Sequence, residues 1–230
     1  MNRKRVCAIL LAAGSGSRMN IGVTKQTLEI KGKSVLLRAL EAFEECADIT
    51  DIILVVKADE LDFAKFESRS VSKLRKIVIG GKSRAESARN GFSAIDFSAD
   101  YVAIHDAARC LIRSELITKV IVDAFSYGAA SASSVVVDTV KRINSDGFAI
   151  ATENREELRL AGTPQIFAYD LYAKAMSLVD AGDVTVTDDN MMMEKIGVPV
   201  YMTDTGKGNI KITHSEDIAF AEFILENRDD

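Results

Sequence analysis

A glycine-rich loop and two basic residues near the start of the chain could bind phosphate groups. The loop, Gly14-Ser15-Gly16, follows an uncharged apolar run at residues 6–11, and Arg18 and Lys25 come shortly after it. Glycine lets backbone N–H groups approach a ligand closely, and basic side chains complement its negative charge. This combination suits a polyphosphate better than the pyrophosphate of a dinucleotide. The alternative is an ordinary strand-to-loop connection in which Arg18 and Lys25 are solvated.

The spacing excludes two common phosphate-binding motifs. The dinucleotide fingerprint requires a glycine or alanine three residues after Gly16, where this chain has Met19. The P-loop of nucleoside triphosphatases requires a glycine five positions before its Gly-Lys-Ser/Thr sequence. Thr27 and Lys76 occupy that position ahead of the two candidate sequences. A phosphate loop of another type is therefore indicated.

A second pair of glycines offers further backbone donors. Gly80-Gly81 ends an apolar run at residues 76–79, and the sequence from Ser83 to Glu86 that follows is a capping box, which predicts the start of a helix. A glycine pair between a strand and a capped helix repeats the arrangement of the first loop. A simple tight turn is the alternative interpretation.

A third group of polar residues follows the apolar run at residues 101–104. Asp106 could accept a sugar hydroxyl or help to hold Mg²⁺, and Arg109 could bind a phosphate. Alternatively, Asp106 caps the next turn and pairs with Arg109. We expect His105 to be a buried histidine with a structural role rather than a catalytic one.

Alternating strands and helices position these groups. Short apolar runs predict buried strands, and helical spacing of apolar residues predicts the helices between them. The predicted strands are 6–11, 52–56, 76–79, 101–104, 132–137, 162–167 with Pro164 at the edge of pairing, 198–202 and a short one within 206–212; the predicted helices are 34–46, 60–68, 83–95, 114–127, 169–179, 190–196 and 214–227. This pattern is typical of an α/β fold, in which ligands bind at the carboxyl ends of the strands.

Residues from about 138 to 158 interrupt that pattern. Asp146-Gly147 lies between two alternating segments, which predicts a β-hairpin. A hairpin has no place within a doubly wound sheet. We therefore expect an arm that packs on another surface, such as a second subunit. The chain is otherwise expected to be a single domain over residues 1–230.

Composition excludes several classes of protein. The chain has 230 residues and a formal net charge of −5, so no overall basic field favours nucleic acid, and no run of eighteen apolar residues predicts a membrane span. Three widely spaced cysteines form neither a zinc pattern nor a disulfide framework, which indicates a reducing cytoplasm. Two histidines are too few for a His-rich metal site.

Taken in order, these motifs resemble the 2-C-methyl-D-erythritol 4-phosphate cytidylyltransferase family. The matching segments are residues 11–19, 25–26, 80–81 with Arg84 and Ser87, 105–109, 138–141, 163–165, 187–189 and 209–213. The resemblance implies a Rossmann-like nucleotidyltransferase fold, a mostly parallel sheet flanked by helices, with an inserted hairpin arm that forms a homodimer. It also implies transfer of CMP from CTP to methylerythritol phosphate, release of pyrophosphate and a need for Mg²⁺.

The same resemblance implies roles for individual residues. The CTP-binding residues would be Ala12, Ala13, Gly14, Gly16, Gly81, Ser87, Asp106 and Ala107, and the catalytic cations Arg18, Lys25 and Lys211. The sugar-phosphate site would comprise Arg109, Thr139, Arg155, Thr163, Thr187 and Lys211, with Thr139 and Arg155 reaching the neighbouring subunit. Mg²⁺ would be held either by Asp106 or by the CTP phosphates alone. The family commonly has proline where this chain has Thr24 and Cys110, and often a basic residue at Ser17. These departures bear on loop rigidity and triphosphate affinity.

Three alternative functions remain open at the level of the sequence. A ribitol-5-phosphate cytidylyltransferase would share the fold, the donor and the chemistry, and differ in the arm and acceptor residues. A nicotinamide-dependent oxidoreductase would use Gly14-Ser15-Gly16 for its cofactor, although the third glycine is absent. The third alternative is a dimeric nucleotide-binding protein without activity.

Overall fold

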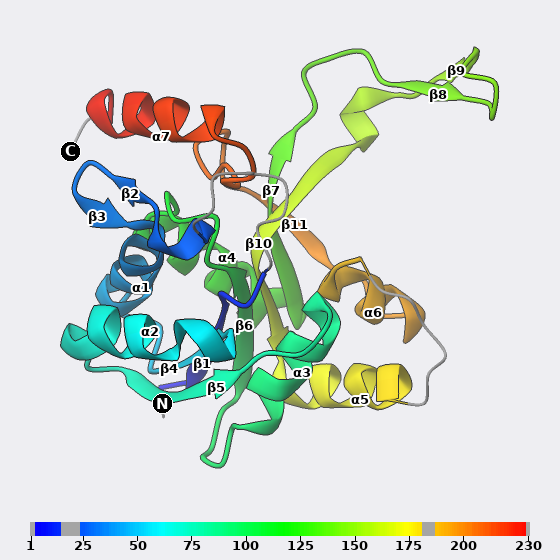
Figure 1. Ribbon diagram of the computed structural model, residues 1–230. Coiled ribbons are helices and arrows are strands. Elements are labelled where there is room, and N and C mark those ends of the chain that lie inside the picture. The colour runs from blue at the N-terminus through cyan, green and yellow to red at the C-terminus, as the bar shows by residue number, and fades with distance from the viewer. Residues whose placement is uncertain (1–2, 15–23, 181–186, 229–230) are drawn as a thin grey trace.

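A mostly parallel sheet forms the centre of the computed structural model, which describes residues 3–14, 24–180 and 187–228 (Figure 1). The strand order is β11-β7-β10-β6-β1-β4-β5. The strands are β1 (Val6–Leu11), β4 (Asp51–Val56), β5 (Leu74–Ile79), β6 (Tyr101–Asp106), β7 (Ala129–Val135), β10 (Arg159–Ala168) and β11 (Tyr201–Asp204). Only β10 runs antiparallel to its neighbours, β6 and β7.

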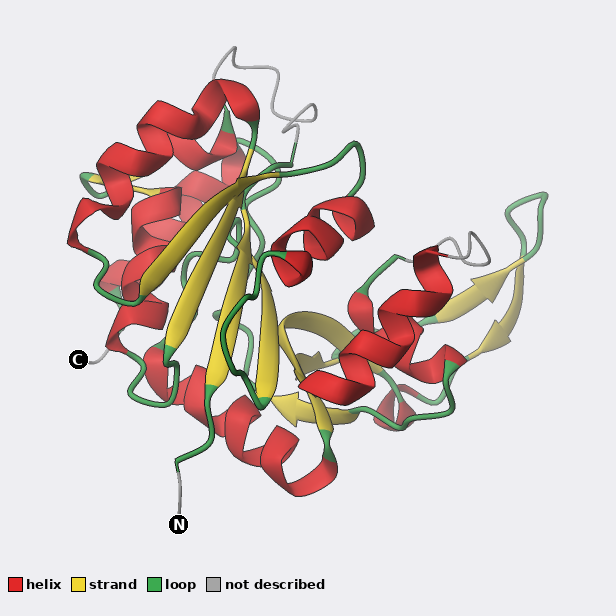
Figure 2. Ribbon diagram, turned by 90° about the horizontal axis from the view of Figure 1, so that it is seen from below, coloured by secondary structure: helices red, strands yellow, loops and turns green. Residues whose placement is uncertain are grey.

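Helices cover both faces of this sheet (Figure 2). They are α1 (Val35–Glu45), α2 (Leu61–Glu67), α3 (Arg84–Ser93), α4 (Ser114–Tyr127), α5 (Tyr169–Asp180), α6 (Asp189–Lys195) and α7 (Glu216–Glu226). Short 3₁₀ turns comprise η1 (Lys25–Thr27), η2 (Ala58–Glu60), η3 (Ser68–Ser70) and η4 (Arg155–Glu157), and β2 (Glu29–Ile30) pairs with β3 (Lys33–Ser34). Among the described residues, no helix is long and apolar enough to cross a membrane.

Strand β1 is central because both of its faces are buried. Val6, Ala8 and Leu10 belong to one hydrophobic cluster, whereas Cys7 and Ile9 belong to the cluster on the opposite face. Alternate side chains of a strand point to opposite faces, so a strand covered on both sides is apolar at every position. This explains the uninterrupted apolar run, and the end of β1 lies between the ends of β6 and β4 at the carboxyl edge of the sheet.

Helix α3 packs unusually close to β1. A Cβ added at Gly91 would lie 2.4 Å from Cγ2 of Ile9, so only glycine fits at this contact. The start of α3 is held by Ser83, whose hydroxyl accepts a hydrogen bond from the Glu86 N–H, as the capping box predicts. The reciprocal bond differs, because the Glu86 carboxylate accepts from the Lys82 N–H rather than from Ser83. These contacts fix the glycine pair before α3 against the end of β1.

The predicted hairpin is present and extends away from the sheet (Figure 1). It consists of β8 (Lys141–Ile143) and β9 (Ala149–Thr152), and its turn contains Gly147 with a φ of +87°. That conformation favours glycine because a Cβ would clash with the backbone. Phe148 and Ile150 are 71% and 61% exposed on this arm, so apolar side chains face away from the core.

Two local expectations were wrong, whereas the expectation for Pro164 is confirmed. Pro164 lies at the edge of pairing although β10 is an interior strand, because the pairing of β10 with β7 shifts register between Ala161 and Gln165 and the pairing with β6 begins at Gln165. No strand forms between residues 206 and 212 in the described chain. In the first turn of α7, the Asp217 carboxylate accepts from the backbone N–H groups of residues 213 and 214, whereas the Ser215 side chain, the expected cap, accepts no capping bond.

Candidate active site

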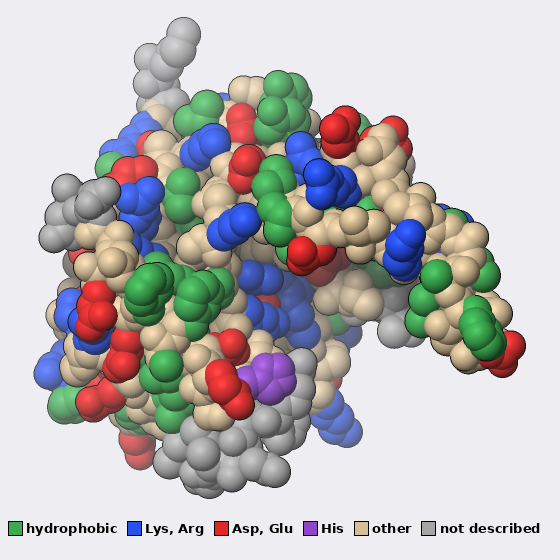
Figure 3. All heavy atoms as spheres, turned by 90° about the horizontal axis from the view of Figure 1, so that it is seen from above, with side chains coloured by type: hydrophobic (Ala, Val, Ile, Leu, Met, Phe, Trp, Pro, Cys, Tyr) green, Lys and Arg blue, Asp and Glu red, His purple; other side chains and the backbone are tan. Residues whose placement is uncertain are grey.

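A cavity of about 480 Å³ opens at the carboxyl ends of β1, β4 and β6. Its walls include the predicted residues Ala13, Gly14, Lys25, Gly81, Ser87, Asp106 and Lys211. Figure 3 shows Lys and Arg side chains grouped in a hollow near the centre of this face of the molecule. The structure therefore brings together residues that span almost two hundred positions of sequence.

One wall of the cavity is built from backbone and small side chains. The Gly81 N–H donates to Oγ of Ser87 at 3.0 Å, and that hydroxyl donates to the carbonyl of Ser83 at 2.9 Å. A Cβ at Gly80 would lie 2.4 Å from Cβ of Ala13, so the loops after β5 and β1 touch. This narrow wall, with few side chains in the way, suits a flat group such as a nucleobase.

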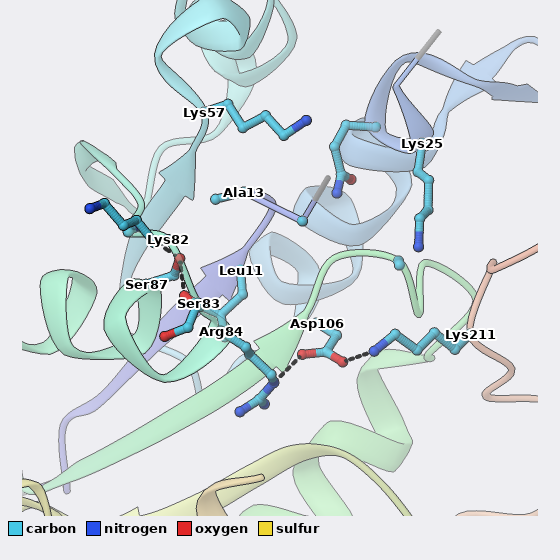
Figure 4. A pocket seen from close by; sticks show the side chains of 14 residues that line it. Leu11, Ala13, Lys25, Lys57, Lys82, Ser83, Arg84, Ser87, Asp106 and Lys211 are labelled. Carbon is cyan, nitrogen blue, oxygen red and sulfur yellow. Dashed lines mark hydrogen bonds and ion pairs between the residues drawn. The ribbon is translucent and has the colours of Figure 1, made fainter. Parts of the chain in front are cut away.

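Asp106 lies at the end of β6 between two cations (Figure 4). One carboxylate oxygen accepts from Nε of Arg84 at 3.0 Å and the other accepts from Nζ of Lys211 at 2.7 Å. Burial by itself would raise the pKa of Asp106, but the charges of Arg84 and Lys211 hold it well below its ordinary value. The carboxylate is therefore ionised, and it forms ion pairs with one basic residue from α3 and one from the segment before α7.

The alternative pairing of Asp106 with Arg109 is not formed. Arg109 instead donates to the backbone carbonyls of Asn209 at 2.9 Å and Ala161 at 3.4 Å. The buried Nε of Arg109 has no hydrogen-bond partner within the described chain. Arg109 thus holds the segment that leads to Lys211, and it does not line the cavity itself.

Arg84 is a residue of the site that we did not predict from the sequence. Its guanidinium contacts Asp106 and also donates to Asp189 at 2.6 Å, at the start of α6. Burial opposes the charge of Arg84, but Asp189 and Asp106 together raise its pKa. Arg84 belonged to a motif that matches the family, but we had assigned it no role in the site.

Asp189 is held in turn by a buried network. The Tyr172 hydroxyl donates to its carboxylate at 2.7 Å, and its backbone N–H donates to Oε1 of Gln165 at 2.9 Å. Gln165 also donates to Asp188, which caps α6 through the Met191 N–H. These bonds connect the start of α6, with the adjacent Thr187, to the wall that carries Arg84.

Several predicted residues support the site without lining the cavity. The Thr163 hydroxyl accepts from the Asp106 N–H at 3.1 Å and lies 3.0 Å from Nδ1 of His105. Ala12 and Ala107 are fully buried, and their N–H groups donate to neighbouring strands. Burial lowers the pKa of His105 to about 3, so the ring is neutral, as expected for a structural histidine. Thr187 is exposed and does not line the cavity.

Other predicted residues lie elsewhere. Thr139 and Arg155 are on the arm, and neither lines the cavity of its own chain. Arg155 donates to the backbone carbonyl of Val137 at 2.7 Å, at the base of the arm. Gly16 and Arg18 lie outside the described residues.

The donor set fits Mg²⁺ only if the substrate supplies most of the ligands. No cluster of three His, Cys, Asp or Glu side chains that could hold a metal occurs in the part of the chain that the structure describes. Asp106 is the carboxylate that lines the cavity and can offer an oxygen ligand. Mg²⁺ is commonly bound by one or two carboxylates together with substrate phosphates and water, so the arrangement is compatible with a metal that arrives with a nucleotide.

Comparisons with known proteins agree with this geometry. Residues 6–227 match the family model described as IspD, 2-C-methyl-D-erythritol 4-phosphate cytidylyltransferase. The cytidylyltransferase of that name from Clostridium perfringens strain SM101 is 40% identical over 224 residues, which are 96% of this chain and 99% of the relative. The one from Clostridium botulinum strain Loch Maree is 40% identical over 220 residues, 95% of this chain and 96% of the relative.

A solved structure shows the same architecture. The 4-diphosphocytidyl-2C-methyl-D-erythritol synthase of Anaerococcus prevotii superposes with a TM-score of 0.89 at 30% identity, covering 98% of each chain. The α/β sheet with a basic cavity at its carboxyl edge, together with these matches, defines a nucleotidyltransferase. More narrowly, the chain belongs to the 2-C-methyl-D-erythritol 4-phosphate cytidylyltransferase family. This assignment favours methylerythritol phosphate over ribitol 5-phosphate and argues against an oxidoreductase.

Proposed function

We propose that this chain transfers CMP from CTP to 2-C-methyl-D-erythritol 4-phosphate. A phosphate oxygen of the acceptor attacks the α-phosphorus of CTP in line, and pyrophosphate leaves from the opposite side. The observation that supports this most strongly is the placement of Lys25, Arg84 and Lys211 around one cavity with Asp106. Cations in that number suit two phosphorylated substrates.

The chemistry requires no general base. The attacking phosphate oxygen is already anionic near neutral pH, and the described wall of the cavity contains no histidine. The obstacle is repulsion between two anions and the growth of charge on the α-phosphoryl group. Fixed cations offset both, because they are positioned before the reaction begins. We assign this role to Lys25, Lys211 and Arg18.

Mg²⁺ would supply further neutralisation of the triphosphate when bound. Asp106 is the residue that would contribute a carboxylate oxygen, with phosphate oxygens and water as the other ligands. Arg84 orients that carboxylate through the bond to Nε. Ala13, Gly81 and Ser87 would hold the cytidine, and Arg109, Thr163 and Thr187 would lie on the acceptor side.

We further propose that the protein is a cytoplasmic homodimer formed through the arm. Hydrophobic side chains are exposed near the arm tip, among them Phe148 and Ile143 (Figure 3). A second subunit would bury them, and it would bring Thr139 and Arg155 towards the neighbouring acceptor site. Free, buried cysteines support a reducing compartment.

Incubation with α-labelled CTP and Mg²⁺ tests the proposed reaction. Methylerythritol phosphate and ribitol 5-phosphate are offered separately, and the labelled CDP-alcohol and pyrophosphate are measured. We expect product with methylerythritol phosphate. A strong preference for ribitol 5-phosphate would overturn the acceptor assignment, and thermal protection by NAD(P) but not by CTP would overturn the reaction class.

A further inference from the structure

A cation that the site description does not use lies at the end of β4. Lys57 directly follows β4, and its side chain lines the same cavity as Lys25 and Lys211. In Figure 4 it extends into the cavity from the β4 side, whereas Asp106, Arg84 and Lys211 lie on the β6 side. Because β4 and β6 pair with opposite edges of β1, the end of β1 lies between the two groups of cations.

A buried carboxylate lies beside Lys57. Glu60, at the end of η2, is only 6% exposed, and neither carboxylate oxygen accepts a hydrogen bond from any described residue. Burial raises its pKa, although nearby Thr24 and Lys57 oppose that rise. The ion pair with Nζ of Lys57 is long, at 3.8 Å, so Lys57 keeps N–H donors for a ligand.

The neighbours of Glu60 show which part of a nucleotide Lys57 would meet. Thr24 lies close enough to Glu60 to lower its pKa, and Thr24 directly precedes Lys25. Glu60 thus links Lys57 to the segment that carries Lys25, and in Figure 4 the Lys57 side chain extends away from Ser87 and Lys82 towards the Lys25 side of the cavity. This side favours contact with phosphate rather than with the base.

In-line attack narrows the choice among the three phosphates. The acceptor-side residues Arg109 and Thr163 lie beside Asp106, on the β6 side of β1. The leaving group departs from the side opposite the nucleophile, which is the β4 side. We propose that Lys57 binds the β- and γ-phosphates of CTP, the part that leaves as pyrophosphate, and that Glu60 is a positioning residue for Lys57. This inference rests on the proposed function.

Comparing the affinities for CTP and CMP shows whether Lys57 contacts the β- and γ-phosphates or the part of the nucleotide that both ligands share. Lys57→Met should weaken CTP binding about tenfold to a hundredfold, the usual worth of a charge-assisted contact, and leave CMP binding within about twofold. Lys57→Arg should keep most of the wild-type CTP affinity. Inhibition by pyrophosphate should weaken in Lys57→Met but not in Lys57→Arg or in the control variant. Binding is measured by calorimetry with Mg²⁺, and Lys65→Met, on exposed α2, is the matched control.

Unchanged CTP affinity, or an equal loss for CTP and CMP, would overturn the assignment. If the wild-type protein itself binds no CTP, the proposed function fails; if it binds CTP and Lys57→Met binds it equally, only the role of Lys57 fails. The double variant Lys57→Met/Glu60→Gln removes both charges, which covers the case in which an unpaired Glu60 unfolds the single variant.

A double-mutant cycle tests the positioning role of Glu60. Glu60→Gln in the wild-type background should weaken CTP binding several-fold, about threefold to tenfold, because Lys57 loses its fixed partner. The same change added to Lys57→Met should weaken it no further. An equal effect in both backgrounds would show that Glu60 acts independently of Lys57.

Discussion

Arg84 and Asp189, which are 105 positions apart in the sequence, form an ion pair of 2.6 Å. The same guanidinium contacts Asp106, so one side chain joins the starts of α3 and α6 to the end of β6. A planar guanidinium can do this because its N–H donors point in fixed, different directions. The pair links the glycine wall of the cavity to the Thr187 segment on the proposed acceptor side.

Asp189→Asn should destabilise the protein. The carboxylate is almost fully buried, and its replacement leaves Arg84 beside a neutral amide while the contact to Asp106 remains. We expect the free energy of unfolding to fall by roughly 2–3 kcal/mol, as for loss of a largely buried charged hydrogen bond. Urea denaturation at pH 7 measures it. The exposed Asp62→Asn serves as control and should cause no measurable change; equal effects of the two variants would contradict the prediction.

Lys211→Gln should reduce turnover about a hundredfold, because loss of one fixed cation from a site that stabilises developing charge costs roughly 3 kcal/mol. Steady-state kinetics with both substrates measure the loss, and circular dichroism checks that the fold is retained. Lys207→Gln, at an exposed position in the preceding turn, should leave kcat unchanged. Near-normal turnover in folded Lys211→Gln would count against the mechanism.

Stability should depend on pH through His105. Its pKa is about 3 in the folded protein and near 6.5 in the unfolded chain. The unfolded state therefore binds the proton first as the pH falls, and stability that is present above pH 6.5 is lost towards pH 3, at up to about 1.4 kcal/mol per pH unit. His105→Gln should show a shallower slope between pH 6.5 and 5 in urea denaturation. The carboxylates that titrate in the wild type also titrate in His105→Gln, so their effects cancel in this comparison. Equal slopes for the two proteins would show that His105 does not cause the pH dependence.

Gly80→Ala should impair both folding and nucleotide binding. The new Cβ would lie 2.4 Å from Cβ of Ala13 and 2.8 Å from Oγ of Ser87, so the two loops must separate. Overpacking of this kind costs about 1–3 kcal/mol, and we expect weaker CTP binding because the base wall moves. Thermal unfolding and calorimetry measure the two effects. Gly14→Ala meets no described atom within 4 Å and is the control for stability.

Much of the fold could be predicted because its signals are local. Ser34 caps α1 by accepting from the Leu37 N–H, Gly128 ends α4 with a φ of +84°, and Gly147 turns the hairpin, all through neighbouring residues. Strand β1 was also predictable, since burial on both faces leaves its own apolar run in the sequence. Motif order was sufficient to indicate the family, which the comparisons confirm.

Pairing within the site depended on tertiary structure. The sequence offered Arg109 as the partner of Asp106, three positions away, whereas the folded chain supplies Arg84 and Lys211 from 22 and 105 positions away. Periodicity and capping signals report how a segment contacts its immediate neighbours. The partner of a buried charge depends instead on where separate helices dock on the sheet, and close packing at Gly91 and Gly80 decides that for α3.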